Sequence, residues 1–303
     1  MSETFVIPAM GWLPDYPDIR DVTFQSERVP SKLQALGQPS VKQMLAKVGA
    51  TTSAPAALPT SVDLRPWCSP IEDQKTIGSC TAHAGVGLVE YFERRAFGKH
   101  LDASRLFLYK VTRNLLKWTG DTGAFLRSTM YALTLFGVPP EEYYPYNIAD
   151  FDKEPSAFCY AFGQSYQAIS YYRLDPPGTT RSNLLTQIKT YLANGLPSMF
   201  GFTVYSSISQ ANTTGKIPYP TRGEKVLGGH AIDAVGYDDN LKIKNTNPGG
   251  IETTGALLIR NSWGTGWGSA GYGWLPYKYV LDGLATDWWS LIKSEWIDTG
   301  QFG

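Results

Sequence analysis

Apolar positions recur at helical spacing through much of the first half of the chain. Between Cys80 and Phe97, small and apolar residues lead into VEYFERR, and two further helices are expected over 103–116 and 124–136. The last of these meets Gly137, which favours a helix stop, and two prolines follow that forbid its continuation. This part of the chain is therefore expected to be mainly helical.

The second half alternates between apolar and polar residues, which predicts strands. One helix, over 182–195 with Ser182 as its cap, interrupts the alternation. The expected strands are bounded by Gly, Pro and Asn and cover 165–174, 197–205, 230–238, 256–263 and 272–280. The segment 238–255 is expected to form an extended hairpin. Helices followed by strands indicate the α+β class.

The first 57 residues have a different character. GWLPDYPDIRD, residues 11–21, is rich in Pro and Asp and is expected to be extended, and a short amphipathic stretch begins at Ser40. Small residues and Pro over 50–61 are typical of a linker. We therefore predict an amino-terminal segment with linker over 1–57 and a folded domain over 58–303.

Composition narrows the function classes. The chain has 303 residues, 43% apolar and 18% charged, with zero net charge, which indicates a globular protein without the basic footprint of nucleic-acid binding. No apolar run is long enough for a membrane span, and no secretory signal is recognisable at the start. Neither observation fixes the compartment. Cys68 and Cys159 either form one disulfide or remain two buried thiols.

Cys80 is the first candidate for chemistry. It follows Gly78 and Ser79 at the expected start of a helix, where the positive end of the helix dipole favours a thiolate. An isolated cysteine is more often an inert core residue. Its role therefore depends on a base within reach.

Three histidines are available as that base. His100 lies in a polar loop, and His83 is three residues after Cys80, a spacing at which two side chains do not converge on one substrate atom. His83 is therefore expected in the interior. His230 follows two glycines and opens an apolar strand, which makes it the best candidate, although a hydrogen-bonded core histidine has the same signature.

Two amides complete the candidate constellation. Asn261 ends an apolar strand, and its side chain is suited to accept the proton of one imidazole nitrogen, with Trp263 shielding that bond from water. Asp233 is an alternative orienting residue. Gln74, six residues before Cys80, is suited to form an oxyanion hole with the backbone N–H of Cys80.

Together these segments resemble the papain family of cysteine peptidases. The resemblance covers about residues 58–290 and, within the family, is greatest to bacterial members with a short prosegment, of the xylellain type. It rests on blocks that occur in the family's order: LPTSVDLRPW, DQKTIGSCTAHA, GGHAIDAVGYD and IRNSWGTGWGSAGYGW. It implies a helical lobe over about 70–160, a β-barrel-like lobe over about 163–290 and a substrate cleft between them.

The resemblance also implies roles for individual residues. Cys80 would attack the carbonyl, His230 would take and return the proton, Asn261 would orient His230, and Gln74 would stabilise the oxyanion. The residues expected to contact the substrate are Gly123, Ala124, Phe125, Leu126, Gly229 and Trp263. No cofactor or metal is expected, because no CxxC pair, HExxH or P-loop pattern is present.

Three positions depart from the family pattern. Ile77 stands where most members have a disulfide cysteine, Thr81 replaces the aromatic residue after the nucleophile, and Gly229 replaces the Asp or Asn before the histidine. These changes bear on substrate preference more than on catalysis.

The amino-terminal segment is interpreted as a cis inhibitor. We expect residues 11–21 to lie across the cleft with Trp12 as an apolar anchor, and the linker 50–61 to be a cleavage region. A tail packed elsewhere is the alternative. The predicted activity is that of a monomeric endopeptidase made as a zymogen. The rivals are a catalytically silent binding module and a thioester-forming transferase of the transglutaminase or acyltransferase type.

Overall fold

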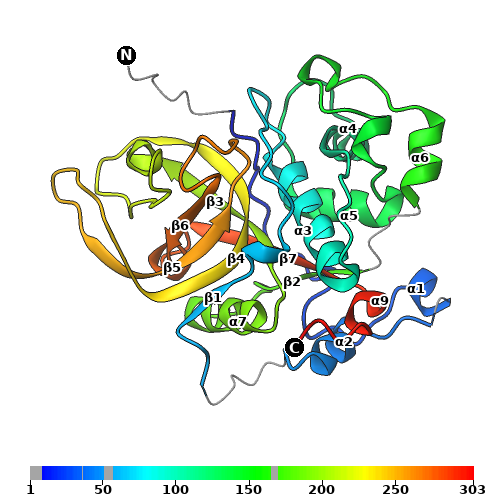
Figure 1. The fold of residues 1–303 in the computed structure, drawn as a ribbon, viewed down its shortest axis with the longest axis horizontal. Coiled ribbons are helices and arrows are strands. Elements are labelled where there is room, and N and C mark those ends of the chain that lie inside the picture. Colours follow the sequence, from blue (N-terminus) through cyan, green and yellow to red (C-terminus); the bar gives the residue numbers. More distant parts are fainter. Residues whose placement is uncertain (1–8, 36, 51–56, 165–169) are drawn as a thin grey trace.

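The protein folds into a helical part and a sheet, and an amino-terminal arm enters between them (Figure 1). The arm comprises the described residues 9–35 and 37–50. The structure is a computed structural model that describes residues 9–35, 37–50, 57–164 and 170–303. In Figure 1 the dark blue start of the arm descends between the sheet and the helices and continues to α1 and α2 beside the carboxy-terminal α9. The arm is therefore placed where the two parts face each other.

The long helix α3 (Cys80–Phe97) is the centre of the helical part. Every residue from Cys80 to Phe92 is buried, because the helix packs against other helices on one side and against the sheet on the other. Gly87 allows this close approach, since a Cβ there would lie 2.4 Å from a guanidinium nitrogen of Arg260. The helices around it are α4 (Arg105–Leu116), α5 (Leu126–Phe136) and α6 (Ala157–Gly163).

An antiparallel sheet of seven strands forms the other part. Its strand order is β2-β7-β3-β4-β5-β6, with β1 paired to β4. The bounds are β1 Ser61–Asp63, β2 Ser170–Arg173, β3 Ser198–Tyr205, β4 Val226–Lys244, β5 Glu252–Arg260, β6 Tyr272–Pro276 and β7 Ala285–Ile292. In the described part of the chain β2 and β6 are the terminal strands of this order and do not pair with each other, so the sheet is not a closed barrel.

Most predicted elements are present, with instructive exceptions. The strand expected over 272–280 stops at Pro276, which is the N-cap of the short helix α8 (Tyr277–Leu281). Helix α7 (Arg181–Ala193) is capped by Thr180 and not by Ser182. The hairpin over 238–255 is confirmed as the continuation of β4 into β5. Residues 165–169 of the first expected strand lie outside the described residues.

The arm belongs to the hydrophobic core. Its helices α1 (Ser31–Ala35) and α2 (Val41–Lys47) follow an extended stretch, and Ser40 caps α2 through a reciprocal bond pair with Gln43. Met44 and Leu45 are buried in the same core cluster as the sheet, and α2 contacts α9 (Ser294–Ile297).

Cys68, Cys80 and Cys159 are buried free thiols, so Cys68 and Cys159 do not form a disulfide. Among the described helices, none has the length and apolar character needed to cross a membrane.

Candidate active site

Cys80 is the first residue of α3 and lies between the helices and the sheet. Its side chain is fully buried, and backbone N–H groups of Ala231 and Gly11 point at the sulfur. Burial raises the pKa of the Cys80 thiol to about 11, and these N–H groups oppose the rise. The neighbours of the sulfur thus include the residue after His230 and a residue of the arm.

His230 lies in β4 and is held by Asn261 at the end of β5. The distance from His230 Nε2 to Asn261 Oδ1 is 2.8 Å, and the same Oδ1 accepts the backbone N–H of Ser262. With an oxygen facing it, Nε2 carries the proton, and Nδ1 is left without a hydrogen-bond partner among the described residues. Burial lowers the pKa of His230 to about 4, against the opposing effect of Asn261.

Trp263 lies against the imidazole of His230. Its ring stacks on the imidazole at a centroid distance of 4.6 Å. Asp233, the alternative orienting residue, does not contact His230. It is buried and forms an ion pair with Arg260 at 3.9 Å. Of these two residues, Asn261 is the one that contacts the imidazole.

Gln74 is fixed by three partners. Its Oε1 accepts a hydrogen bond of 2.7 Å from Ser262 Oγ, and its Nε2 donates to the carbonyl of Ile77 and, at 2.7 Å, to the carbonyl of Ala9. The donor expected to stabilise an oxyanion is thus occupied by a carbonyl of the arm. Ser262 was missed by sequence reasoning, although it stands inside the block that drew attention to Asn261 and Trp263.

Residues 9–13, called the cleft segment here, pair with the backbone on both sides. The N–H of Ala124 donates to Gly11 O at 2.8 Å, and the N–H of Leu13 donates to Ala124 O at 3.1 Å. On the opposite side the N–H of Trp12 donates to Gly229 O at 3.1 Å. The predicted contacts Ala124 and Gly229 therefore flank one extended chain segment.

Gly123 is held by a hydrogen bond from its N–H, and its lack of a side chain leaves space for Gly11 of the cleft segment. Its N–H donates to Tyr109 Oη at 3.0 Å, and Tyr109 in turn donates to Asp121. A Cβ on Gly123 would lie 2.3 Å from Gly11 O, and its φ of 72° is itself unfavourable for other residues. Tyr109 and Asp121 are supports that the sequence reasoning did not identify.

The two remaining predicted subsite residues, Phe125 and Leu126, differ in burial. Leu126 is fully buried in the core at the start of α5. The ring of Phe125 rests against Trp118 at a centroid distance of 5.5 Å. Their contribution to a substrate subsite remains a prediction.

Comparison with known proteins identifies the family. The model described as "Papain family cysteine protease" matches residues 58–282.

The chain belongs to the papain family of cysteine proteases.

This papain-family protease has relatives that match most of its length. An uncharacterized peptidase C1-like protein of Acanthamoeba polyphaga mimivirus is 32% identical over 95% of the chain and 88% of its own length. The crystal structure of xylellain, a cysteine protease from Xylella fastidiosa, is 32% identical, with a TM-score of 0.72 and coverage of 94% of this chain and 96% of that one. Digestive procathepsin L 3 of Tenebrio molitor shares the fold at 20% identity, with a TM-score of 0.61 and coverage of 84% and 79%.

The other two histidines of this papain-family protease, His83 and His100, differ in burial. His83 is buried against Tyr146 at a ring distance of 4.9 Å, and burial lowers its pKa to about 3, in agreement with the predicted interior position. His100 is exposed after the end of α3. In the described ranges, no group of three or more His, Cys, Asp or Glu side chains is arranged to hold a metal ion.

Proposed function

We propose that this cysteine peptidase is an endopeptidase that is latent in its full-length form. Cys80 is the nucleophile, His230 the general base and acid, Asn261 the residue that orients His230, and Gln74 an oxyanion donor. Its substrates are peptide segments in extended conformation, and it acts as a monomer without a cofactor. The backbone pairing of the cleft segment supports the proposal, because a peptide needs the same donors and acceptors.

The reaction uses only groups at this site. The Cys80 thiol gives its proton to Nδ1 of His230, and the sulfur forms a bond to the substrate carbonyl carbon. The resulting oxyanion accepts hydrogen bonds from Nε2 of Gln74 and from the backbone N–H of Cys80. His230 returns the proton to the leaving amine, and water, deprotonated by His230, then releases the acid and restores the thiol.

Latency is the role proposed for the arm. The observation that carries it is the hydrogen bond from Gln74 Nε2 to the carbonyl of Ala9, because this bond occupies the donor that a reacting carbonyl requires. The pKa shifts point the same way. In the closed form the thiol of Cys80 has a raised pKa and His230 a lowered one, which favours the neutral pair over the reactive thiolate and imidazolium.

The direct test is alkylation of Cys80. The full-length chain and a Trp12→Ala variant are treated with iodoacetamide at pH 6, and the modified cysteines are mapped by mass spectrometry. We expect Cys80 to react slowly in the full-length chain, and in the variant to react faster than Cys68 and Cys159. A Cys80 that reacts no faster than these two buried thiols in the variant contradicts the proposal and favours a catalytically silent module.

Product analysis separates hydrolysis from transfer. A peptide substrate is incubated with the Trp12→Ala variant, and the products are analysed by mass spectrometry. New free amino and carboxyl termini support an endopeptidase. Isopeptide or ester products would instead assign the chain to the transferase class.

A further inference from the structure

One carboxylate ties the loop before Cys80 to the loop that pairs with the cleft segment. The backbone N–H of Gly78 donates to Oδ1 and Oδ2 of Asp121, at 2.9 and 3.1 Å. Asp121 belongs to the same loop as Gly123 and Ala124, and Ala124 pairs with the cleft segment. A Cβ on Gly78 would lie 3.3 Å from Asp121 Oδ1 and 3.5 Å from the Cα of Gly123. The two loops are therefore in direct contact beside this carboxylate.

The hydroxyl of Tyr109 fixes the position of the carboxylate. Tyr109 is a fully buried residue of α4, and its Oη donates to Asp121 Oδ1 at 2.5 Å. The same oxygen accepts the backbone N–H of Gly123 at 3.0 Å. The guanidinium of Arg113 lies over the Tyr109 ring, 4.1 Å from its centroid, and donates to the carbonyl of Gly120 at 2.5 Å. Helix α4 thus holds Asp121 and the residues on both sides of it.

The link sets the width of the gap that holds the backbone of the cleft segment. Gly11 lies in this gap, since a Cβ on Gly11 would lie 1.8 Å from Gly78 O and a Cβ on Gly123 would lie 2.3 Å from Gly11 O. A substrate in the same place would be bound by the Ala124 loop and attacked by Cys80 from the other loop. The distance from the sulfur to the carbonyl carbon then depends on how firmly the loops are joined. A misplacement of about 1 Å is enough to cost about a hundredfold in rate.

We propose that Asp121 and Tyr109 are positioning residues, which hold the substrate-binding loop at a fixed distance from the nucleophile. The inference rests on the proposed function, in which a substrate takes the place of the cleft segment. Ile77 offers no thiol for a disulfide at this point, and hydrogen bonds from its neighbour Gly78 to Asp121 join the loops instead. The link contains no sulfur, so reductants do not break it.

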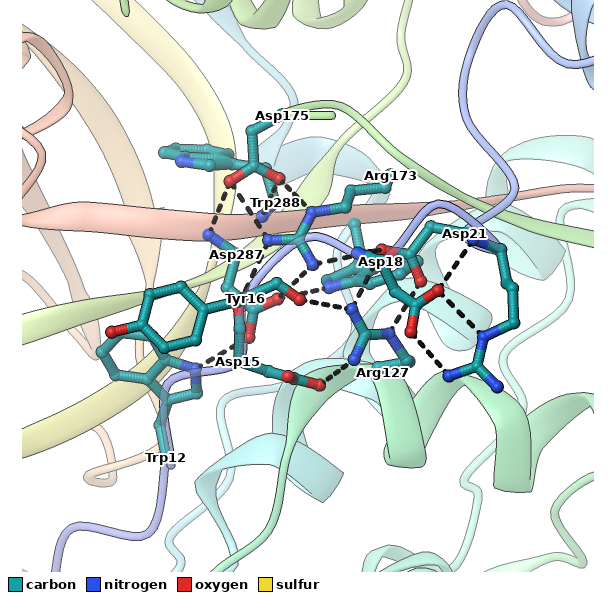
Figure 2. A network of polar contacts seen from close by, with 12 residues as sticks. Trp12, Asp15, Tyr16, Asp18, Asp21, Arg127, Arg173, Asp175, Asp287 and Trp288 are labelled. Atoms are coloured by element: carbon teal, nitrogen blue, oxygen red, sulfur yellow. Dashed lines mark hydrogen bonds and ion pairs between the residues drawn. The ribbon is translucent and has the colours of Figure 1, made fainter. Parts of the chain in front are cut away.

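The test compares Asp121 variants in peptide cleavage and in alkylation of Cys80. All variants are made in the Trp12→Ala chain, which lacks the buried indole whose N–H donates to Asp287 at 3.1 Å (Figure 2). Both kcat and KM are measured for one peptide, and kcat is expressed per Cys80 that reacts with iodoacetamide. Asp121→Ala is expected to lower kcat by about tenfold or more and to change KM little. The alkylation rate should stay the same, because iodoacetamide does not need the Ala124 loop.

Asp121→Asn separates position from charge. An asparagine presents a neutral oxygen in the place of Oδ1, the atom that accepts from both Gly78 and Tyr109. This variant is therefore expected to retain most of the kcat of the Trp12→Ala chain. A loss as large as that of Asp121→Ala would mean that the negative charge itself acts on the reaction, and would overturn the positioning role.

Tyr109→Phe tests the link from its other end. It removes the hydroxyl that the carboxylate and a backbone N–H share, so kcat should fall with little change in KM. Tyr91→Phe is the matched control, because Tyr91 is also buried in a helix, and its Oη donates to Gly195 O at 3.0 Å and accepts from Arg95 at 2.8 Å. These partners belong to neither loop. Equal kcat values in the two variants would contradict the proposed role of Tyr109.

The outcomes separate this inference from the proposed function. If the Trp12→Ala chain cleaves the peptide and Asp121→Ala leaves kcat unchanged, the inference is overturned and the endopeptidase remains. A parallel fall in the alkylation rate also overturns the inference, because the defect would then lie at the thiol itself. If the Trp12→Ala chain, shown to be folded, cleaves no peptide, the proposed function fails and the inference with it.

Discussion

Nε2 of Gln74 donates a hydrogen bond of 2.7 Å to the carbonyl oxygen of Ala9, so an amide expected at the reaction centre is bound to the chain's own backbone. The bond joins residues 65 positions apart and holds the cleft segment against Gln74. Any change that displaces the cleft segment is therefore expected to free Gln74 and expose Cys80 together.

Gly11→Ala is expected to open the cleft. A Cβ at Gly11 would lie 1.8 Å from the backbone oxygen of Gly78, which cannot move without disturbing the start of α3. Overpacking of this kind costs roughly 1–3 kcal/mol, so the rate of Cys80 alkylation should rise about tenfold or more. Gly266→Ala is the matched control, because its Cβ would meet nothing within 4 Å. Equal rates in the two variants would contradict the closed arrangement.

Arg127→Met is expected to loosen the arm and destabilise the fold. Arg127 of α5 contacts three parts of the arm: it forms ion pairs with Asp15 and Asp21 and donates to the carbonyl of Tyr16 (Figure 2). Because the Arg127 side chain is 25% exposed, we expect a loss of about 2 kcal/mol in the free energy of unfolding, less than for a fully buried pair. Urea denaturation measures the loss, and Cys80 alkylation should accelerate.

The control for this variant is Arg20→Met. Arg20 pairs with Asp18 in the same arm, but its side chain is 85% exposed, so its removal should leave the urea midpoint unchanged. Similar shifts in both variants would mean that Arg127 does not hold the arm through its buried contacts.

His230 is expected to make the closed form sensitive to acid. Burial lowers its pKa from 6.5 to about 4, so the folded protein binds fewer protons at this residue than the unfolded chain does. This contribution to stability is present above pH 6.5 and is lost as the pH falls towards 4, by up to about 3 kcal/mol. Asp287 has the opposite effect on stability. Burial raises its pKa to about 6, so the folded protein binds more protons at this residue than the unfolded chain, and stability is lost as the pH rises through 6.

Comparison with His230→Gln isolates the effect. The free energy of unfolding is measured by urea denaturation between pH 7 and pH 4 for both chains. The free energy of unfolding of the unmodified chain, minus that of the variant, should decrease as the pH falls. Parallel profiles would show that His230 has the same pKa in the folded protein as in the unfolded chain, and would contradict the lowered value.

Ser262→Ala is expected to act on the chemical step through Gln74. Without the hydrogen bond from Ser262 Oγ, the Gln74 side chain loses one of the contacts that orient its Nε2. In the Gly11→Ala background we expect kcat to fall by about tenfold, less than the hundredfold or more expected for Gln74→Ala, with little change in KM. The alkylation rate of Cys80 should not change, and a parallel fall in that rate would indicate a structural defect instead.

Local patterns predicted the elements whose residues repeat regularly. The helix from Cys80 to Phe97 has the predicted bounds because its small and apolar residues suit a helix that is buried on two sides. The end of the strand at Pro276 was missed: this proline is the last residue of β6 and the N-cap of α8, and the residues after it were taken as strand. The strand β7 was missed because nearly all of its residues are buried and alternation is absent.

The contacts that place the arm have no signal in the sequence. Trp12 was singled out as an apolar anchor, but its partner Asp287 is 275 residues away, and nothing local distinguishes that aspartate. The same holds for Arg127, whose ion-pair partners precede it by more than 100 residues. Such pairs are set by the packing of distant elements, which a single sequence does not encode in any readable pattern.

The packing of α2 against α9 gives a cut in the linker an unexpected result. Met44 and Leu45 lie in the common core, and Lys47 forms an ion pair with Asp298 next to the carboxyl terminus. If a protease cut between residues 50 and 57, the arm would remain bound as a separate polypeptide. The product would be a two-chain protein, with two bands on a denaturing gel and one species in solution, still closed by its own first chain.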